Sequence, residues 1–489
     1  MYLIGIDIGT SSTKGVLVDQ DGKVIARGRR PHKVEFPLPG WAEQNADLVW
    51  WNETRDIIQE LLAKSEIPPG EIAAVGCSGV CPVVLPIDKN GKPLRNGILY
   101  SIDARADKQI RLLKNEVGLE PIDDSGQPLS FQSVIPKLMW LRENEPDVWA
   151  NTDTILGATG YVVYRLCGVK TVDHFTAADG GFGYSMKRFA WNEEAFRLVD
   201  IDVGVMPRLA WPSDIAGHLS AQAAAETGLL EGTPVITGTG DALAEMISTG
   251  VSQVGETALL YGSTLTTMTI IDGSWFHEGF ITVPGSEPEQ ITTSSVLGSG
   301  MSSFSWLRRL LGEETAQCLF DRYEKEARII ARGADGLLAL PYLTGQRSPV
   351  INPHMRGAFI GLSQHHQPSH MLRSLMEGLG FALRFTLEEI PYIDSFRVVG
   401  GGVNSPLLLQ IVSDICRRTQ KVVSGYVGAP LGSAWLAGRG VGLVDANSHK
   451  EWVGIEREII PDESSSAEYD AIYDKFKASL MGVEPVFKQ

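Results

Sequence analysis

Two aspartates flanked by glycines follow apolar stretches that have the composition of β-strands. Asp7 opens the polar run 7–14 after the apolar residues 3–6, and Asp241 closes the run 238–241 after the apolar stretch 232–237. Glycines at such positions allow a ligand to approach the backbone closely. Phosphoryl transfer needs one carboxylate near a metal-bound phosphate and another near the accepting hydroxyl. The pattern therefore predicts an α/β protein whose strands end at a phosphoryl-transfer site.

The length and charge of the chain limit the classes of protein that it can belong to. A chain of 489 residues exceeds what one core supports, which predicts two or three domains. Hydrophobic residues make up 43% and charged residues 21%, as in ordinary soluble proteins. A net charge of −16 argues against a nucleic-acid partner. No apolar run reaches about 18 residues, and the first residues lack the features of a secretory signal. We therefore expect a cytoplasmic protein that is not bound to a membrane.

The metal-binding residue types are sparse. Five cysteines are scattered along the chain, which favours reduced thiols. Cys77 and Cys81 lie four apart without a second pair nearby, so buried thiols are favoured over a metal or redox site. His365, His366 and His370 form the one histidine cluster in the sequence. The Pro-Ser pair between them favours the start of a surface helix over a metal site.

The two halves of the sequence resemble each other weakly. Residues 257–271 read as strand, Gly-Ser-Thr turn and strand, followed by Asp-Gly, which repeats the order of residues 3–22. Leu260 occupies the position of Asp7 in this repeat. The repeat predicts two related lobes facing each other across a cleft, with a boundary near residues 243–254. Chance similarity between two hairpins is the alternative. Helical spacing is predicted over residues 47–63, 137–149, 302–311, 369–390 and 406–418.

The turn after Asp7 has the donors of a phosphate site. Thr10 and Ser11 offer N–H and hydroxyl donors, Lys14 adds a positive charge, and Asp7 can hold hydrated Mg²⁺. The turn is not a Walker motif, because no glycine precedes Lys14 and Gly15 follows it. A simple polar hairpin turn is the alternative interpretation.

Asp241 has the setting of a general base. Its carboxylate would accept the proton of a hydroxyl that attacks the γ-phosphorus of ATP. The alternative is a helix N-cap, since the helix-forming residues 242–245 follow it. The two roles are compatible, because a cap position also presents the carboxylate at the end of a strand.

Two further glycine loops precede predicted helices. Residues 400–402 are three glycines that follow a short apolar strand, and residues 298–300 form a Gly-Ser-Gly loop. Glycines at a helix N-terminus allow a nucleotide to lie against the backbone. Together with the turns after Asp7 and Asp241, these loops favour nucleotide binding.

These motifs, taken in order, make the chain resemble the FGGY-type carbohydrate kinases of the sugar-kinase and actin-like superfamily over essentially its whole length. The matching segments are residues 5–10, 92–105, 136–141, 240–241, 262–264, 341–349, 356–362, 400–405 and 432–438.

The resemblance implies an α/β fold of two ribonuclease-H-like lobes around a central cleft, with ATP and Mg²⁺ as cofactors. We expect an N-terminal lobe over 1–246 and a nucleotide-binding C-terminal lobe over 247–489. The resemblance makes Asp241 the catalytic base, Asp7 the metal-side carboxylate and Asp103 a ligand of sugar hydroxyls. The other residues expected near the substrate are Arg105, Ser78, Cys81 and Tyr100. Those expected near the nucleotide and phosphates are Thr10, Ser11, Lys14, Gly262, Ser263, Thr264, Gly300, Gly401, Gly402 and Asn404.

Departures from the xylulokinase pattern lie mainly on the sugar side. Val80 and Cys81 replace a Met-His pair, and Tyr100 begins a segment that lacks the usual tryptophan before the substrate aspartate. Ala242 replaces an asparagine after the base, and Gln346 replaces a glutamate. The resemblance predicts a ketopentose such as D-xylulose as acceptor. Ribulose, gluconate or a polyol such as glycerol or erythritol is the alternative, because losing a hydrogen-bonding side chain changes discrimination strongly.

A non-enzymatic protein is the alternative to a kinase. A nucleotide-binding regulator or an actin-like scaffold would share the fold, but the presence of both Asp7 and Asp241 argues against it. Dimerisation is common in the family, so the resemblance is compatible with a homodimer. The expected partners are a sugar and ATP, without nucleic acid or membrane.

Overall fold

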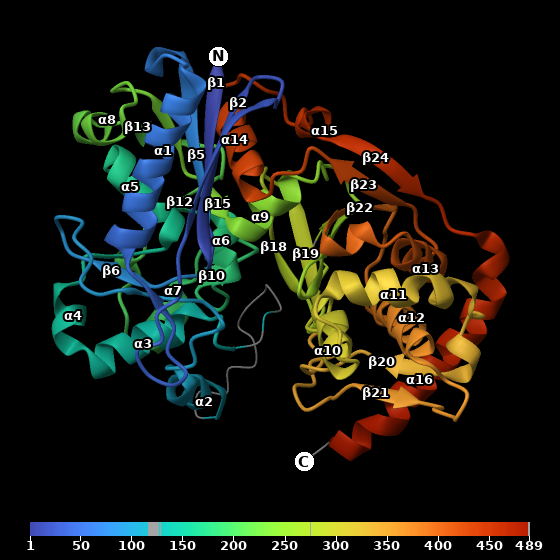
Figure 1. Cartoon of the computed structure of the whole chain (residues 1–489). Helices are drawn as coiled ribbons and strands as arrows, with labels where there is room; N and C mark the ends of the chain where they lie inside the picture. Colours follow the sequence, from blue (N-terminus) through green and yellow to red (C-terminus); the bar gives the residue numbers. More distant parts are fainter. Residues whose placement is uncertain (116–126, 128, 274, 488–489) are drawn as a thin grey trace. The chain divides into compact units, whose positions relative to one another are not determined.

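The computed structural model describes residues 1–115, 127, 129–273 and 275–487 (Figure 1). They form two compact α/β units. The first unit comprises residues 1–252 together with 282–292 and 425–453, and the second comprises the rest. No helix of the described part of the chain is long and apolar enough to cross a membrane.

The first unit contains a seven-stranded mixed sheet. Its strands, in the order of pairing, are β13 (Ile215–His218), β14 (Pro234–Ile236), β5 (Ile72–Gly79), β1 (Tyr2–Ile8), β2 (Ser12–Asp19) and β3 (Val24–Pro31), with β15 (Thr239–Gly240) also paired to β5.

Three parallel strands of this sheet end at the same edge. β1 and β15 both run parallel to β5, with Asp7 opposite Ser78 and Gly240 opposite Gly79. The strand predicted before Asp7 is therefore confirmed as β1, which continues to Ile8. This register brings the residue after Gly240 to the edge where β1 ends.

Helices and short strand pairs make up the rest of the first unit. Its helices are the π-helix η1 (Ala46–Trp51), the 3₁₀-helices η2 (Pro69–Glu71) and η3 (Val203–Val205), and α1 (Asn52–Ser65), α2 (Asp107–Asn115), α3 (Val134–Asn144), α4 (Pro146–Asn151), α5 (Ala158–Cys167), α6 (His174–Asp179), α7 (Glu193–Leu198), α8 (Ala221–Thr227), α9 (Asp241–Ile247), α14 (Ala429–Gly440) and α15 (His449–Trp452). Its short strand pairs are β4 (Glu43–Gln44) with β7 (Gly97–Ile98), β6 (Leu85–Ile87) with β8 (Thr154–Leu156), β9 (Thr171–Asp173) with β12 (Arg208–Ala210), and β10 (Tyr184–Ser185) with β11 (Ala190–Trp191).

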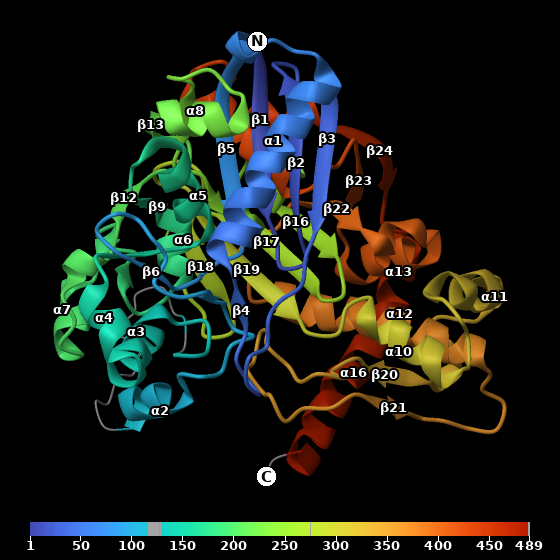
Figure 2. The ribbon, with the colours of Figure 1, turned by 60° about the vertical axis from the view of Figure 1, so that its left-hand side comes forward.

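Two predicted helices differ from the observed ones in detail. The helix expected over 47–63 begins one residue earlier with a π-helical turn and continues as α1, which lies across β2 and β3 (Figure 2). The single helix expected over 137–149 is wrong, because the chain breaks between α3 and α4 at Glu145. Pro146 cannot donate the hydrogen bond that a continuous helix would require, but it suits the first turn of α4.

Helix α14 packs so closely on β1 and β5 that the backbones approach each other directly (Figure 1). A Cβ atom at Gly5 would lie 1.9 Å from the carbonyl oxygen of Pro430, and one at Gly76 would lie 2.1 Å from that of Ser433. At Gly432 of α14 itself, a Cβ would lie 2.0 Å from a carbonyl oxygen of α9. Only glycine fits at such approaches, so these three positions fix α14 against the sheet and against α9.

A second sheet, formed mainly by residues of the second unit, has a related strand order. Its seven strands, in the order of pairing, are β18 (Ile281–Pro284), β19 (Ile291–Leu297), β17 (Leu265–Ile271), β16 (Glu256–Tyr261), β22 (Ser395–Gly400), β23 (Gln420–Ser424) and β24 (Gly454–Ile459). The remaining elements are α10 (Ser302–Leu310), α11 (Ala316–Ile329), α12 (Pro368–Leu387), α13 (Pro406–Cys416), α16 (Ser466–Phe487), the 3₁₀-helices η4 (Ala334–Gly336), η5 (Gly401–Asn404) and η6 (Glu463–Ser465), and the pair β20 (Leu338–Leu340) with β21 (Ala358–Ile360).

The repeat seen in the sequence corresponds to matching strand pairs. β1 pairs antiparallel with β2 and parallel with β5, while β16 pairs antiparallel with β17 and parallel with β22. Leu260 of β16 occupies the place that Asp7 has in β1, as the repeat predicts. The helices expected over 302–311, 369–390 and 406–418 correspond to α10, α12 and α13.

The contact between α14 and β1 predicts a stability effect. We expect Gly5→Ala to lower the free energy of unfolding by about 1–3 kcal/mol, because the new methyl group forces α14 away from β1. Gly70→Ala is the matched control, since a Cβ at the exposed Gly70 would meet no atom within 4 Å. Thermal unfolding followed by circular dichroism measures both variants. Equal midpoints for the two variants would contradict the packing described.

Candidate active site

Asp7 is a buried carboxylate at the end of β1, with an exposed fraction of 3%. The hydroxyl of Ser78, itself fully buried, donates to Oδ1 of Asp7 at 3.0 Å, and Lys14 Nζ lies 3.9 Å from Oδ2. Burial raises the pKa of Asp7 to about 6, although Lys14 and Ser78 both act to lower it. Ser78, expected on the sugar side, thus contacts Asp7 and orients it.

Asp241 is the first residue of α9 and is only half-buried. Its Oδ1 accepts the backbone N–H of Ala242 at 2.8 Å. The N-cap alternative for Asp241 is wrong, because Gly240 occupies the N-cap position and Asp241 is the first residue of the first turn. Burial raises the pKa of Asp241 well above its ordinary value, and the negative charges of Asp7 and Glu245 raise it further. Asp241 and Asp7 are therefore close enough to interact electrostatically.

Glu245 is a third carboxylate at this edge, and the sequence analysis gave it no role. It follows Asp241 by four residues, which places both side chains on one face of α9. Its Oε2 accepts the backbone N–H of Ala429 at 3.3 Å, at the first turn of α14. Burial raises the pKa of Glu245 to about 7, Asp7 raises it further, and Lys14 acts in the opposite direction. The i, i+4 spacing was the signal that could have identified it.

Cys81 lies directly beside the residue that precedes Asp241. A Cβ atom at Gly240 would lie 2.4 Å from Cys81 Sγ, and this thiol donates to Oδ2 of Asp179 at 3.6 Å. Burial raises the pKa of Cys81 well above its ordinary value, and the charges of Asp179 and Asp241 add to this effect. The structure thus brings the predicted residue Cys81 next to the candidate base.

Tyr100 connects the substrate-side segment to the turn after Asp7. Its hydroxyl lies 3.0 Å from Oγ1 of Thr10. Burial raises the pKa of this hydroxyl, the bond to Thr10 lowers it, and the charges of Asp241 and Cys81 raise it. Lys137 Nζ donates to the carbonyl oxygen of Tyr100 at 3.1 Å, so the segment is held from behind by a buried lysine.

The turn after Asp7 has its carbonyl groups bound to the protein. His32 Nε2 lies 3.0 Å from the carbonyl oxygen of Gly9, Gln44 Nε2 donates to that of Thr10 at 3.1 Å, and His32 N donates to that of Ser11 at 3.0 Å. Within the described part of the chain, the N–H groups of Thr10 and Ser11 donate to no acceptor. Free N–H groups on successive residues suit an anion such as a phosphate.

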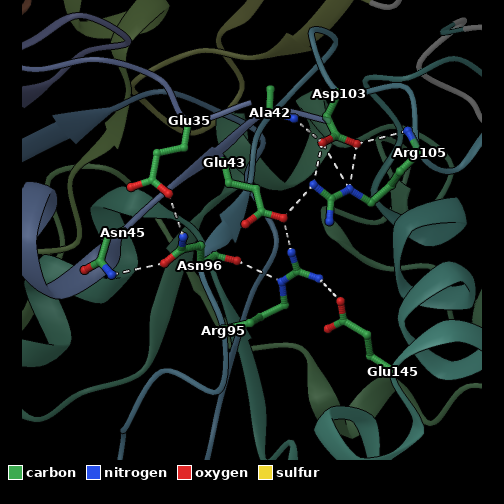
Figure 3. A network of polar contacts seen from close by, with 9 residues as sticks. All are labelled: Glu35, Ala42, Glu43, Asn45, Arg95, Asn96, Asp103, Arg105 and Glu145. Atoms are coloured by element: carbon green, nitrogen blue, oxygen red, sulfur yellow. Dashed lines mark hydrogen bonds and ion pairs between the residues drawn. The ribbon is translucent and has the colours of Figure 1, made fainter. Parts of the chain in front are cut away.

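Asp103 and Arg105 form the centre of a buried ion network (Figure 3). Asp103 is fully buried, its Oδ2 accepts from Ala42 N at 2.6 Å and from Arg105 Nη2 at 2.7 Å, and its Oδ1 accepts from Arg105 Nε at 2.9 Å. Arg105 Nη2 also lies 2.8 Å from Oε1 of Glu43, and its guanidinium lies over the ring of Trp41. Both oxygens of Asp103 therefore have protein partners, and its contact with a sugar hydroxyl stays a prediction.

The second unit contains a cavity of about 300 Å³ at the ends of β16 and β22. The residues that line it are Tyr261, Gly262, Ser263, Met301, Phe304, Ser305, Gln317, Phe320, Gly401, Asn404 and Ser405. Gly262, Ser263, Gly401 and Asn404 were predicted from the sequence. A Cβ atom at Gly401 would meet no atom within 4 Å, so the backbone there faces open space.

The apolar wall of this cavity was not foreseen. The rings of Phe304 and Phe320 lie 5.3 Å apart, on α10 and α11 respectively. Aromatic side chains together with a few polar groups are typical of sites for flat ligands such as a nucleobase. Aromatic residues at helical spacing usually indicate a core, and therefore their positions in the sequence carry no signal for a ligand.

Three of the predicted nucleotide residues shape the loops beside the cavity. A Cβ at Gly300 would lie 2.4 Å from the backbone nitrogen of Leu265, and one at Gly402 would lie 2.7 Å from the side chain of Tyr261. Thr264 Oγ1 lies 3.3 Å from the hydroxyl of its near neighbour Thr266. These residues do not line the cavity, but they determine how closely its loops pack.

Few side chains in the described part of the structure could bind a metal ion. Within the described residues, no group of three or more His, Cys, Asp or Glu side chains could hold a metal ion by itself. His370 instead pairs with Asp335 at 3.2 Å and caps the start of α12. Magnesium needs few protein ligands, because water and phosphate oxygens complete its shell. The carboxylate oxygens of Asp7, which is buried, and of Glu245, which is half-buried, fit this requirement.

Comparison with known proteins identifies the family. The model of the FGGY family of carbohydrate kinases matches the chain with its N-terminal domain over residues 2–248 and with its C-terminal domain over 263–441. The chain therefore belongs to this family, and it is an ATP-dependent carbohydrate kinase that transfers phosphate to an alcohol group.

The individual relatives have more than one acceptor in their names. The chain is 27% identical to the xylulose kinase of Bacillus subtilis over 491 residues, covering 97% of this chain and 96% of that protein. It is also 27% identical to the gluconokinase of Bacillus subtilis over 495 residues, covering 97% and 94%. The crystal structure of xylulose kinase from Rhodospirillum rubrum superposes with a TM-score of 0.92 at 26% identity, covering all of both chains.

The charges around Asp241 predict the pH dependence of activity. A general base must be ionised, so kcat/KM should fall as the pH decreases through the raised pKa of Asp241. Removing the negative charge of Glu245 favours the ionised form of Asp241. We therefore expect Glu245→Gln to shift the fall of kcat/KM on the acidic side, called the acid limb, to lower pH. This shift does not depend on how the substitution changes the maximal rate. The exposed Glu71→Gln is the control, and an unchanged or upward-shifted limb in Glu245→Gln would argue against the coupling.

The cavity of the second unit predicts an effect on ATP use. We expect Gly401→Leu to raise the KM for ATP roughly tenfold or more, which corresponds to about 1.4 kcal/mol, because the new side chain occupies open space in the cavity. Its thermal midpoint should stay at the wild-type value. Gly402→Ala should instead lower the midpoint, because its methyl group meets Tyr261. Unchanged use of ATP by Gly401→Leu would exclude this cavity as the nucleotide site.

Proposed function

We propose that this kinase phosphorylates a hydroxyl of a ketopentose such as D-xylulose, with Asp241 as the general base. The observation that carries the proposal is the position of Asp241. It is half-buried at the start of α9, its pKa is raised, and it lies beside Cys81 and near Tyr100. A carboxylate that binds a proton more readily than usual is suited to accept one from a hydroxyl.

The proposed chemical step moves one proton and one phosphoryl group. Asp241 accepts the proton of the substrate hydroxyl while the hydroxyl oxygen forms a bond to the γ-phosphorus. The bond between this phosphorus and the bridging oxygen breaks, which leaves ADP with the electron pair. The carboxylate gains the proton, and loss of that proton to solvent regenerates the base.

Two carboxylates of the first unit are proposed as the magnesium side of the site. Asp7 and Glu245 supply hard oxygen ligands, and Lys14 balances part of their charge. Bound Mg²⁺ would neutralise phosphate charge during transfer. The free N–H groups of Thr10 and Ser11 are proposed as phosphate donors at the same turn.

The nucleotide is proposed to bind in the cavity of the second unit. Phe304 and Phe320 would contact the base, while the backbone at Gly401 and the side chain of Asn404 would lie against the rest of the nucleoside. Gly262 and Ser263 would lie near the phosphates, with Thr264, Gly300 and Gly402 supporting the loops. The functional division into residues 1–246 for the sugar and 247–489 for the nucleotide is part of this proposal.

A second acceptor class is supported by a specific observation. The gluconokinase of Bacillus subtilis shares the same 27% identity as the xylulose kinase of that organism. Gluconate, ribulose and polyols such as glycerol or erythritol are therefore the alternatives in the same reaction. We further propose that the enzyme acts in the cytoplasm, without a nucleic-acid or membrane partner. A homodimer stays a prediction, which light scattering of the purified protein tests.

The role of Asp241 is tested by replacing its carboxylate with an amide. We expect Asp241→Asn to lower kcat by roughly 10²-fold or more, the scale of lost general-base catalysis. Release of ADP is measured with a panel of ketopentoses, polyols and aldonates, and circular dichroism confirms the fold of the variant. Near-normal turnover by Asp241→Asn would remove Asp241 from the role of base.

The placement of Asp103 on the sugar side predicts that its substitution changes sugar binding and not ATP binding. We expect Asp103→Ala to raise the KM for the sugar, because it releases Arg105 and the backbone at Ala42 from a buried network. Binding of ATP, followed by calorimetric titration, should stay unchanged. An equal loss of affinity for ATP and for the sugar would refute the placement of this network on the sugar side.

A further inference from the structure

Asp179, the last residue of α6, is a nearly buried carboxylate that the mechanism above does not use. Its exposed fraction is 7%. Oδ2 accepts from Gln132 Nε2 at 2.9 Å and from Cys81 Sγ at 3.6 Å. Within the described part of the chain, Oδ1 of Asp179 has no hydrogen-bond partner, and it is not sealed from solvent. A carboxylate oxygen left without a donor at this depth can accept a further hydrogen bond.

Cys81 places Asp179 next to the candidate base. The thiol contacts Asp179 on one side and the backbone at Gly240 on the other, directly before Asp241. The charge of Asp179 also contributes to the raised pKa of Asp241. Asp173, which accepts from the hydroxyl of Thr239, lies in the same group. The acceptor hydroxyl that reaches Asp241 therefore lies among carboxylates.

The basic side chains of the candidate site described above already have partners. Lys14 lies at Asp7, and Arg105 is held by Asp103 and Glu43. Lys137 Nζ donates to the carbonyl oxygens of Leu99 and Tyr100. Besides burial, neighbouring carboxylates raise the pKa of both residues: Asp173 acts on Asp179, and Asp7, Glu245 and Asp179 act on Asp241. The surroundings of Asp241 thus carry excess negative charge.

We propose that Asp179 is a specificity-determining residue, which accepts a hydrogen bond from an acceptor hydroxyl and excludes acceptors that carry a carboxylate. The substrate class is therefore a neutral ketose or polyol, and aldonates such as gluconate are rejected. This inference rests on the proposed function, because it assumes that the acceptor binds at Asp241. It selects between acceptor classes that sequence identity leaves equal.

A buried carboxylate discriminates between neutral and anionic acceptors in two ways. A hydrogen bond to an ionised acceptor contributes about 1.5–3 kcal/mol, and a neutral polyol can supply its donor. An anionic acceptor would bring a like charge into the same low-dielectric surroundings, which costs several kcal/mol. Burial raises the pKa of Asp179 to about 7, so the carboxylate is ionised at alkaline pH and the discrimination is greatest there.

The test compares neutral and anionic acceptors with and without the charge of Asp179. At alkaline pH and saturating ATP, ADP release is measured for xylulose, ribulose, erythritol and glycerol, and for gluconate. We expect the best neutral acceptor to exceed gluconate in kcat/KM by about 10²-fold or more. In Asp179→Asn, kcat/KM for that acceptor should fall roughly tenfold or more, mainly through KM. The ratio between the neutral acceptor and gluconate should shrink by a similar factor.

Asp200→Asn is the matched control, because this aspartate is fully exposed and the substitution removes the same charge. It should leave both values and their ratio unchanged. Deoxy analogues of the best acceptor provide a second readout. With the wild type, the analogue that lacks the hydroxyl bound by Asp179 should have a lower kcat/KM than the parent acceptor. With Asp179→Asn, this analogue and the parent acceptor should have the same kcat/KM. The thermal midpoint of Asp179→Asn shows whether the variant is folded.

The outcomes separate this inference from the proposed function. A wild type that prefers gluconate, or an Asp179→Asn variant with an unchanged ratio, overturns the inference while the kinase function stands. A wild type that turns over none of the acceptors, neutral or anionic, overturns the proposed function. Equal losses for neutral and anionic acceptors in Asp179→Asn would show that the residue acts only on structure, which also overturns the inference.

Discussion

The burial of several carboxylates close together at one edge of the first sheet is the constraint on which the candidate site depends. Strands β1 and β15 both run parallel to β5, so Asp7 and the start of α9 meet where these strands end. Burial raises the pKa of Asp7, Asp241 and Glu245, and the charges of neighbouring carboxylates raise those of Asp241 and Glu245 further. We propose that such a site binds a divalent cation on one side and accepts a proton on the other. Both properties are what transfer of a phosphate to an alcohol requires.

Backbone packing holds this edge in place. Glycines in β1, β5 and α14 allow the helix to lie directly on the sheet and on α9. The same helix supplies the N–H of Ala429 to Glu245, so its first turn takes part in the electrostatics of the site. Two buried features fix the segment that carries Tyr100. One is the ion network of Asp103, Arg105 and Glu43, and the other is the amine of Lys137, which donates to the carbonyl oxygen of Tyr100. Packing and charge therefore act on the same few elements.

Much of the fold could be predicted from the sequence, because strands and long helices have a periodicity that a local window contains. The strand at 265–271, the helices at 302–310 and 406–416, and the repeated strand pairs follow this rule. The break at Pro146 also had a local signal, because a proline inside a helical pattern ends the helix. The packing of α14 on β1 had none, since it joins residues more than 400 positions apart. Asp179 and Phe304 were not predicted, because their positions depend on neighbours in space, whereas Glu245 had a local signal in its spacing from Asp241. Whether Asp103 contacts the sugar, and whether the other predicted residues bind substrate or ATP, stays a prediction.

Titration of the aspartate carboxyl groups by ¹³C NMR tests the central claim most directly. With ¹³Cγ-labelled aspartate, the resonance of Asp241, assigned through Asp241→Asn, should titrate well above the ordinary aspartate range in the free enzyme. In Asp7→Asn the same resonance should titrate at lower pH, because one negative neighbour is gone. A resonance that titrates in the ordinary range, or that does not respond to Asp7→Asn, would contradict the convergence of these carboxylates.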